Sequence, residues 1–151
     1  MAEQRLGLIM HGVTGRMGYN QHLVRSILAI RDQGGVTLSN GDRLVINPII
    51  VGRDGDKIER LAKKHNIARW GTDIDAALAN PDDTVFFDAG TTLMRASLLE
   101  KALDAGKHVY CEKPISDDLD IAVALAKKAR ESGLKHGVVQ DKLFLPGLLK
   151  L

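Results

Sequence analysis

The sequence predicts an α/β fold built on a doubly wound parallel sheet. Five short apolar runs have the composition of strands, and segments with helical spacing lie between them. Strands of a parallel sheet are covered by helices on both faces, so they form continuous apolar runs. Regular alternation of strand and helix is typical of the doubly wound arrangement. The expected strands are residues 6–10, 46–51, 84–88, 108–111 and 136–140.

The helical segments are recognised by their apolar spacing and their stop signals. In the first of them, Leu23 and Leu28 lie on one apolar stripe. Glycine or asparagine just after the last helical residue is a common stop signal, and Asn66, Gly106 and Gly133 occupy such places. The expected helices are residues 17–30, 56–65, a short one capped by Thr72, 93–105 and one that begins after Ser116.

One insertion, residues 31–47, interrupts this alternation. Asn40-Gly41 lies between two apolar runs, which is a strong signal for a β-hairpin. We therefore expect a small β-hairpin insertion between the first helix and the second strand, the alternative being a plain surface loop. Pro48 predicts an edge position or an irregular stretch in that strand.

Composition describes an ordinary globular protein of one domain. The chain has 151 residues, 44% of them hydrophobic and 26% charged, with a formal net charge of +2. It has no cluster of Lys and Arg, which argues against a nucleic-acid partner, and no apolar stretch of the ~20 residues that a membrane span needs. The N-terminus lacks the apolar core of a signal peptide, so we expect a cytoplasmic protein. Cys111 is the single cysteine and is expected to be buried, and the five histidines lack metal-ligand spacing.

A glycine-rich turn between the first strand and the first helix is the first candidate site. Residues 12–18 have the pattern Gly-x-x-Gly-x-x-Gly. Glycines at such a turn allow a sharp bend, close approach of a pyrophosphate and tight helix packing, and the helix N-terminus attracts phosphate. The alternative is a purely structural turn. The residues expected to bind the cofactor here are Gly12, Val13, Thr14, Gly15, Arg16 and Met17.

Two charged residues after the second strand bear on the choice of cofactor. NAD-binding proteins usually place an acidic residue there for the ribose 2′-hydroxyl. Here Gly52 is followed by Arg53, whose guanidinium suits a 2′-phosphate, which favours NADP. Asp54 is either an acceptor for a ribose hydroxyl, which would favour NAD, or a helix N-cap.

The ends of the next two strands supply the remaining candidates. Gly90, Thr91 and Thr92 follow the third of the long strands, where they line the cofactor cleft, cap the next helix, or do both. Asp88 is expected to be a buried hydrogen-bonded residue. The fourth strand ends in Glu112, Lys113 and Pro114.

All three residues of this tripeptide are expected to contact the cofactor, and each also has a role of its own. Glu112 is expected to hold Lys113 or to bind a cofactor ribose. Lys113 presents an ammonium group to the cofactor rim, where it is the candidate catalytic residue. Pro114 fixes the turn, and the peptide bond before it is a candidate for the cis form.

Residues 102–114, which read ALDAGKHVYCEKP, resemble a signature of the glucose–fructose oxidoreductase and myo-inositol dehydrogenase family. The resemblance covers nearly the whole chain. It implies a Rossmann domain over residues 1–142 that binds NAD or NADP, and hydride transfer to or from a hydroxyl-bearing carbon of a sugar, cyclitol or polyol. It also implies that Lys113 assists proton transfer. Residues 143–151 then begin the link to a second domain that carries the substrate pocket. The fragment is expected to bind cofactor without turning over substrate, and the whole protein to form a homo-oligomer.

The sequence departs from the family pattern at two places. Gly15-Arg16-Met17-Gly18 resembles dihydrodipicolinate reductase, which leaves a reductase of that type as an alternative. Arg95 stands where the family has a histidine, and Gly90-Thr91-Thr92 replaces the family's Thr-Pro-Asn run. A nucleotide-binding regulatory module without redox chemistry is the third possibility, since the fold alone permits it.

Overall fold

The computed structural model describes residues 2–150, apart from the side chains of residues 143 and 144. Within that range it contains one twisted sheet of seven strands, ordered β2-β3-β1-β5-β6-β7, with β4 also paired to β3. Every pairing is parallel except that of β2 with β3. The predicted doubly wound α/β fold is confirmed. The strands are β1 Glu3–His11, β2 Val36–Thr37, β3 Arg43–Val51, β4 Arg69–Gly71, β5 Asp83–Asp88, β6 His108–Cys111 and β7 His136–Val138.

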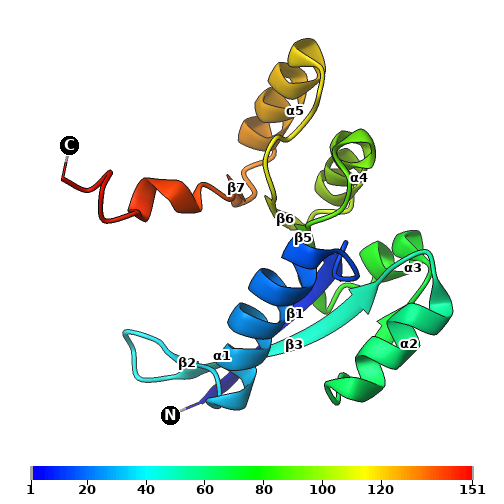
Figure 1. Ribbon diagram of the computed structural model, residues 1–151, viewed down its shortest axis with the longest axis vertical. Helices are drawn as coiled ribbons and strands as arrows, with labels where there is room; N and C mark the ends of the chain where they lie inside the picture. Colours follow the sequence, from blue (N-terminus) through cyan, green and yellow to red (C-terminus); the bar gives the residue numbers. More distant parts are fainter. Residues whose placement is uncertain (1, 151) are drawn as a thin grey trace.

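Helices follow the strands and lie against both faces of the sheet (Figure 1). The first expected helix differs in detail, because residues 18–28 are wound with the wider i→i+5 hydrogen bonding, while residues 16–17 and 29–32 are α-helical. The helical elements are η1 Gly18–Leu28, α1 Ala29–Asp32, α2 Gly55–Lys64, α3 Ile74–Ala79, α4 Thr92–Asp104, α5 Leu119–Glu131 and the short η2 Asp141–Phe144.

The hydrophobic core has two parts, one on each face of the sheet. Ile9 of β1 packs with residues of α3, α4 and α5, whereas its neighbours Leu8 and Met10 pack with η1 and α2. Successive side chains of a strand point to opposite faces, so a strand covered on both sides must be apolar throughout. This is the physical reason for the continuous apolar runs in the sequence.

Aspartates cap α3 and α5, and at α3 the expected cap was a different residue. The Asp73 side chain accepts a hydrogen bond from the Ala76 N–H at 3.0 Å, so Asp73 caps α3 and the assignment of Thr72 was wrong. Asp118 caps α5 in the same way through the Ile121 N–H at 2.9 Å. An aspartate carboxylate is a strong N-cap because it accepts an otherwise unpaired N–H and interacts favourably with the helix dipole.

The insertion between η1 and β3 forms a short antiparallel ribbon. Val36 and Thr37 of β2 pair with Leu44 and Arg43, and Gly41 has the positive φ (85°) that the turn requires. β2 pairs residues 43–44 of β3, and β4 pairs residues 49–51. Pro48 falls between these stretches, at a point where the lack of a backbone N–H costs no ladder hydrogen bond on that side.

β4 has no counterpart among the predicted strands. It has only three residues, and Trp70 at its centre is 40% exposed, so it lacks an apolar run.

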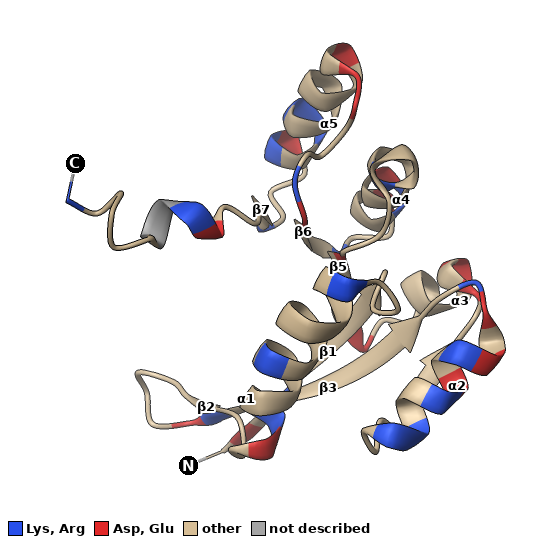
Figure 2. Cartoon of the chain, in the orientation of Figure 1, with Lys and Arg blue, Asp and Glu red and all other residues tan. Residues whose placement is uncertain are grey.

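Lys and Arg are interspersed with Asp and Glu along α2 and α5 (Figure 2). Within residues 2–150, no helix has the length and apolar character needed to cross a membrane. The expectation of a link to a second domain includes Leu151 and the side chains of residues 143 and 144, which lie outside the described part of the chain.

Candidate functional site

The strand order reverses between β1 and β5, and this position defines the candidate site. From β1 the chain moves outward to β3 and β4, and from β5 it moves the other way to β6 and β7. The paired register of β1 and β5 ends at His11 and Asp88. Ligands of open parallel sheets bind beyond the carboxyl ends of the strands at such a reversal. The glycine turn and residues 89–92 meet at this edge.

Two glycines of the turn are required by the atoms packed around them, and the third leaves space for a ligand. Gly12 has a φ of +78°, and a Cβ there would lie 2.2 Å from the Gly90 nitrogen. A Cβ on Gly18 would lie 2.3 Å from the Gly12 carbonyl oxygen, so this glycine lets the helix pack on the turn. A Cβ on Gly15 would meet only the Gly12 oxygen, at 3.4 Å. Gly15 therefore borders open space in which a pyrophosphate can approach the backbone.

A cleft of about 250 Å³ opens at this edge and unites many of the predicted cofactor residues. The sequence prediction missed Gly52, Ala89 and Met94, which also line the cleft, because none of them has a polar side chain that would give a chemical signal. The predicted residues that line the cleft are Gly12, Thr14, Gly15, Arg53, Gly90 and Thr91, together with His11.

Other predicted residues, Thr91 excepted, do not line this cleft. Val13 is fully buried in the core and borders only a second, neighbouring hollow. Met17 is 41% exposed but lines neither this cleft nor the neighbouring hollow. Thr91 occupies the cap position of α4 without a side-chain capping bond, and Thr92 begins that helix beside Arg95.

A second hollow, of about 280 Å³, adjoins the cleft through Thr14 and Gly15. Arg16 and Lys57 also line it and give it positive charge. Asp54, at its margin, is engaged as the N-cap of α2. Its carboxylate accepts the Lys57 N–H at 3.0 Å and pairs with Lys57 Nζ at 3.2 Å. These two hydrogen bonds lower the pKa of Asp54. The cap interpretation of Asp54 is thus the one that its contacts support.

Glu112 is held by protein groups. It is only 9% exposed, its Oε1 lies 2.6 Å from His22 Nε2, and its Oε2 accepts the Lys113 N–H at 3.2 Å. The His22 ring also packs on Phe87 with a centroid distance of 4.7 Å. Of the two expected roles for Glu112, these contacts favour the holding of Lys113 over the binding of a ribose.

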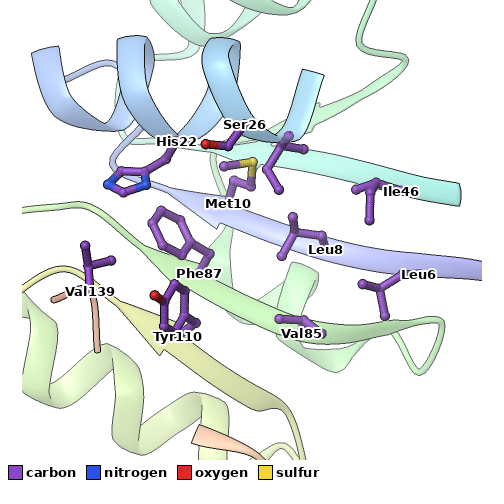
Figure 3. A pocket seen from close by; sticks show the side chains of 11 residues that line it. Leu6, Leu8, Met10, His22, Ser26, Ile46, Val85, Phe87, Tyr110 and Val139 are labelled. Atoms are coloured by element: carbon purple, nitrogen blue, oxygen red, sulfur yellow. The ribbon is translucent and has the colours of Figure 1, made fainter. Parts of the chain in front are cut away.

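His22 also lies on the wall of an apolar cavity on the η1 face of the sheet (Figure 3). The cavity has a volume of about 380 Å³, and aliphatic and aromatic side chains of β1, β5 and β6 line most of it. It lacks the glycine turn and the basic residues that a dinucleotide needs, so it is separate from the candidate site.

Lys113 lies at the carboxyl end of β6, next to β5, and its side chain is exposed. The peptide bond between Lys113 and Pro114 is cis, in agreement with the expectation. The Pro114 carbonyl accepts a hydrogen bond from Arg95 Nη1, and Arg95 Nη2 donates to the Gly90 carbonyl at 2.6 Å. Arg95 therefore joins the Lys113 turn to a residue that lines the cleft.

Asp88, buried as predicted, lies under the cleft with both carboxylate oxygens in use. Oδ1 accepts the Gly90 N–H at 3.0 Å and lies 2.7 Å from His11 Nδ1, while Oδ2 accepts from Arg95 Nε at 2.8 Å. Burial acts to raise the pKa of Asp88, but the hydrogen bonds from His11, Gly90 and Arg95 outweigh it and lower the pKa overall.

Cys111 behaves as a structural residue. It is 2% exposed, and burial raises the pKa of its thiol to about 11, which keeps it protonated near neutral pH. No group of three or more His, Cys, Asp or Glu side chains among the described residues is arranged to hold a metal ion.

The geometry fits a dinucleotide cofactor. The η1 helix begins without a capping side chain and without an acidic residue in its first turn, so its N-terminus is open to an anion. Gly15 leaves space beside it, and the cleft reaches from there to Gly90 and Thr91. The fold and the site together define a dinucleotide-binding domain of the Rossmann type.

Comparison with known proteins assigns the family. Residues 12–140 match the model of the Gfo/Idh/MocA oxidoreductase family, described as an NAD-binding Rossmann fold. The chain belongs to this family and carries its NAD(P)-binding domain.

Three similar proteins illustrate this relationship. The chain is 52% identical to the D-xylose dehydrogenase of Paenarthrobacter nicotinovorans over 94% of its own length and 37% of the relative's. A crystal structure of an NAD-binding oxidoreductase from Klebsiella pneumoniae has a TM-score of 0.76 at 24% identity, over 97% of this chain and 37% of that one. A putative NADPH-dependent oxidoreductase from Desulfitobacterium hafniense has a TM-score of 0.71 at 27% identity, over 97% of this chain and 38% of that one. The chain thus spans somewhat over a third of the length of these proteins.

Proposed function

We propose that the full-length protein transfers a hydride between a nicotinamide cofactor and a hydroxyl-bearing carbon of a sugar, cyclitol or related polyol. Family membership and the 52% identity to a D-xylose dehydrogenase support this proposal. The observation that carries it is the position of Lys113. This exposed lysine follows β6 at the same sheet edge as the cleft, and its turn is joined through Arg95 to Gly90.

Each group at the site has a separate task in this proposal. When bound, the nicotinamide supplies the acceptor or donor of the hydride. The backbone of residues 12–17 binds the pyrophosphate, and Gly90 with Thr91 borders the nicotinamide end of the cleft. As a neutral amine, Lys113 Nζ takes the hydroxyl proton during oxidation and becomes an ammonium, which returns the proton during reduction, while Glu112 fixes the backbone of Lys113.

We further propose a preference for NADP. Arg53 borders the cleft, and Arg16 and Lys57 line the adjoining hollow, which places three cations near the expected position of a 2′-phosphate. The acidic residue that could favour NAD, Asp54, is already engaged as a helix cap.

We also propose that residues 1–142 form the dinucleotide-binding domain and that the rest of the full-length protein contributes the substrate pocket. The coverage of only 37% of the D-xylose dehydrogenase supports this division. The present chain is then expected to bind cofactor without turnover, and the whole protein is expected to form a cytoplasmic homo-oligomer.

The test is a titration of the full-length protein with NADPH and NADH, followed by nicotinamide fluorescence, with D-xylose as the first substrate assayed. We expect tighter binding of NADPH. Arg53→Ala should weaken NADPH binding by about tenfold or more, the value of one lost charge-assisted hydrogen bond, and should affect NADH less. Arg5→Ala is the matched control, because Arg5 is an exposed arginine near the opposite end of β1.

Each result has a defined consequence. Lys113→Met should lower kcat far more than it lowers cofactor affinity. Failure of the wild type to bind either cofactor at millimolar concentration would refute the proposal. Binding without turnover of any polyol would favour a regulatory module. Reduction of a dihydrodipicolinate-type substrate would favour the alternative that the Gly15–Gly18 sequence suggests.

A further inference from the structure

Arg95 of α4 binds two separate segments at the candidate site, residues 88–90 at the end of β5 and the turn that contains Pro114, with one side chain. Its Nε donates to Asp88 Oδ2 at 2.8 Å, its Nη2 donates to the Gly90 carbonyl at 2.6 Å, and its Nη1 donates to the Pro114 carbonyl. The side chain is 3% exposed, and its partner Asp88 is fully buried. A buried charge with every donor group engaged is a fixed structural element.

The contacts of Arg95 require a guanidinium group. Its planar fork presents five N–H donors in fixed directions, and here they reach one carboxylate and two carbonyl oxygens that face it from different sides. A lysine ammonium is a single point of charge, which can neutralise Asp88 but cannot span Gly90 and Pro114 together.

The two carbonyls belong to the two parts of the candidate site that the proposed reaction needs. Gly90 lines the cofactor cleft, and Pro114 directly follows Lys113. β5 and β6 are adjacent strands, but their paired register ends at Asp88 and Cys111, before either of these residues. Arg95 thus joins the cleft to the turn that contains Lys113 and Pro114, here called the lysine turn. It does so beyond the point where the pairing of β5 with β6 ends.

We propose that Arg95 is a positioning residue, which sets the distance between Lys113 and the nicotinamide end of the cofactor cleft by clamping the Pro114 carbonyl to Gly90 and Asp88. This inference rests on the proposed function for its catalytic consequence. The mechanical part, that Arg95 immobilises the lysine turn, does not depend on that function.

A second arginine–aspartate pair, whose aspartate also lies on β5, provides a matched control. Arg69 Nη1 donates to Asp83 Oδ1 at 2.8 Å and its Nη2 pairs with Oδ2, while Asp83 is fully buried at the start of β5. Arg69 Nη1 also contacts a backbone carbonyl, that of Asn47, at 3.4 Å. This pair lies at the opposite end of β5, away from the site, and Arg69 is more exposed, at 25%.

The experiment compares Arg95→Lys with Arg69→Lys in the full-length protein. Two quantities are measured: kcat with the sugar or polyol that the wild type turns over, and amide hydrogen exchange of Gly90 and Lys113 without cofactor. Arg95→Lys should lower kcat by about 100-fold, because a displacement of about 1 Å at a reacting group can cost that much. It should also speed exchange at Lys113 and Gly90 at least about tenfold relative to Arg69→Lys.

Arg69→Lys should leave kcat and both exchange rates within about threefold of the wild type, since its contacts lie at the other end of the strand. Equal effects of the two variants on kcat and on exchange would overturn the proposal. Arg95→His, which also cannot span three partners, replaces Arg95→Lys if that variant does not fold. If the wild type shows no turnover, the proposed function fails, and the exchange rates alone decide whether Arg95 clamps the turn.

Discussion

Gly12 is the position in the glycine turn where the addition of one methyl group should destabilise the site most. The φ of Gly12 is +78°, a conformation that costs an L-residue about 1–2 kcal/mol. The added Cβ would also lie 2.2 Å from the Gly90 nitrogen and 2.3 Å from the Ala89 carbonyl carbon. Backbone atoms cannot rotate away as a side chain can, so the turn must move, at a further cost of about 1–3 kcal/mol. Gly12→Ala should therefore lower the free energy of unfolding by about 2–5 kcal/mol.

Gly106→Ala separates the two contributions. Gly106 has a φ of +72°, but a Cβ there would have no heavy atom within 4 Å. This variant should lose only the conformational part, about 1–2 kcal/mol, and should bind cofactor as the wild type does. Urea unfolding gives the stabilities, and nicotinamide fluorescence gives the affinities. The reasoning fails if Gly12→Ala is no less stable than Gly106→Ala and retains its cofactor affinity.

Two further predictions concern aspartates. Asp73→Ala should lower the free energy of unfolding by about 1 kcal/mol through loss of the α3 cap, while Thr72→Ala should change it by less than about 0.5 kcal/mol; the reverse order in urea unfolding would contradict the cap assignment. The pKa of Asp88 is lower in the folded state, so its stabilising contribution is present above its unfolded pKa of about 3.9 and is lost as the pH falls toward the folded value. Unfolding measured between pH 5 and pH 2 should therefore show a shallower pH dependence for Asp88→Asn than for the wild type, and identical slopes would refute this linkage.

The sequence was sufficient where structure follows from local pattern. Buried parallel strands such as β5 must be apolar on both faces, and the glycine turn must avoid the steric conflict at Gly12, so both leave a direct trace in the residue order. Three-residue β4 leaves no such trace, because its formation depends on β3 and not on its own composition. The cap of α3 was misassigned because Thr72 and Asp73 are adjacent and both suit an N-cap.

Contacts between distant residues explain why the site could be predicted only in part. His22 and Glu112 are 90 residues apart, and His11 and Asp88 are 77 apart, so no local pattern relates them. His22 contacts Glu112, which from the sequence was a candidate for binding a ribose. His11 contacts Asp88, for which no partner could be named from the sequence. From the sequence alone, the Glu112 carboxylate is available to bind a ribose, but in the fold it contacts His22.

Arg95 is another residue whose contacts could not be predicted from the sequence. In the sequence it is only an arginine at a place where the family has histidine, whereas in the fold it binds Asp88, Gly90 and Pro114 at once. A buried arginine needs several partners to offset its desolvation, and here two of them are carbonyls at the candidate site. The departure from the family pattern is therefore compatible with an intact site, because the arginine supplies bonds that hold the lysine turn and the cofactor cleft together.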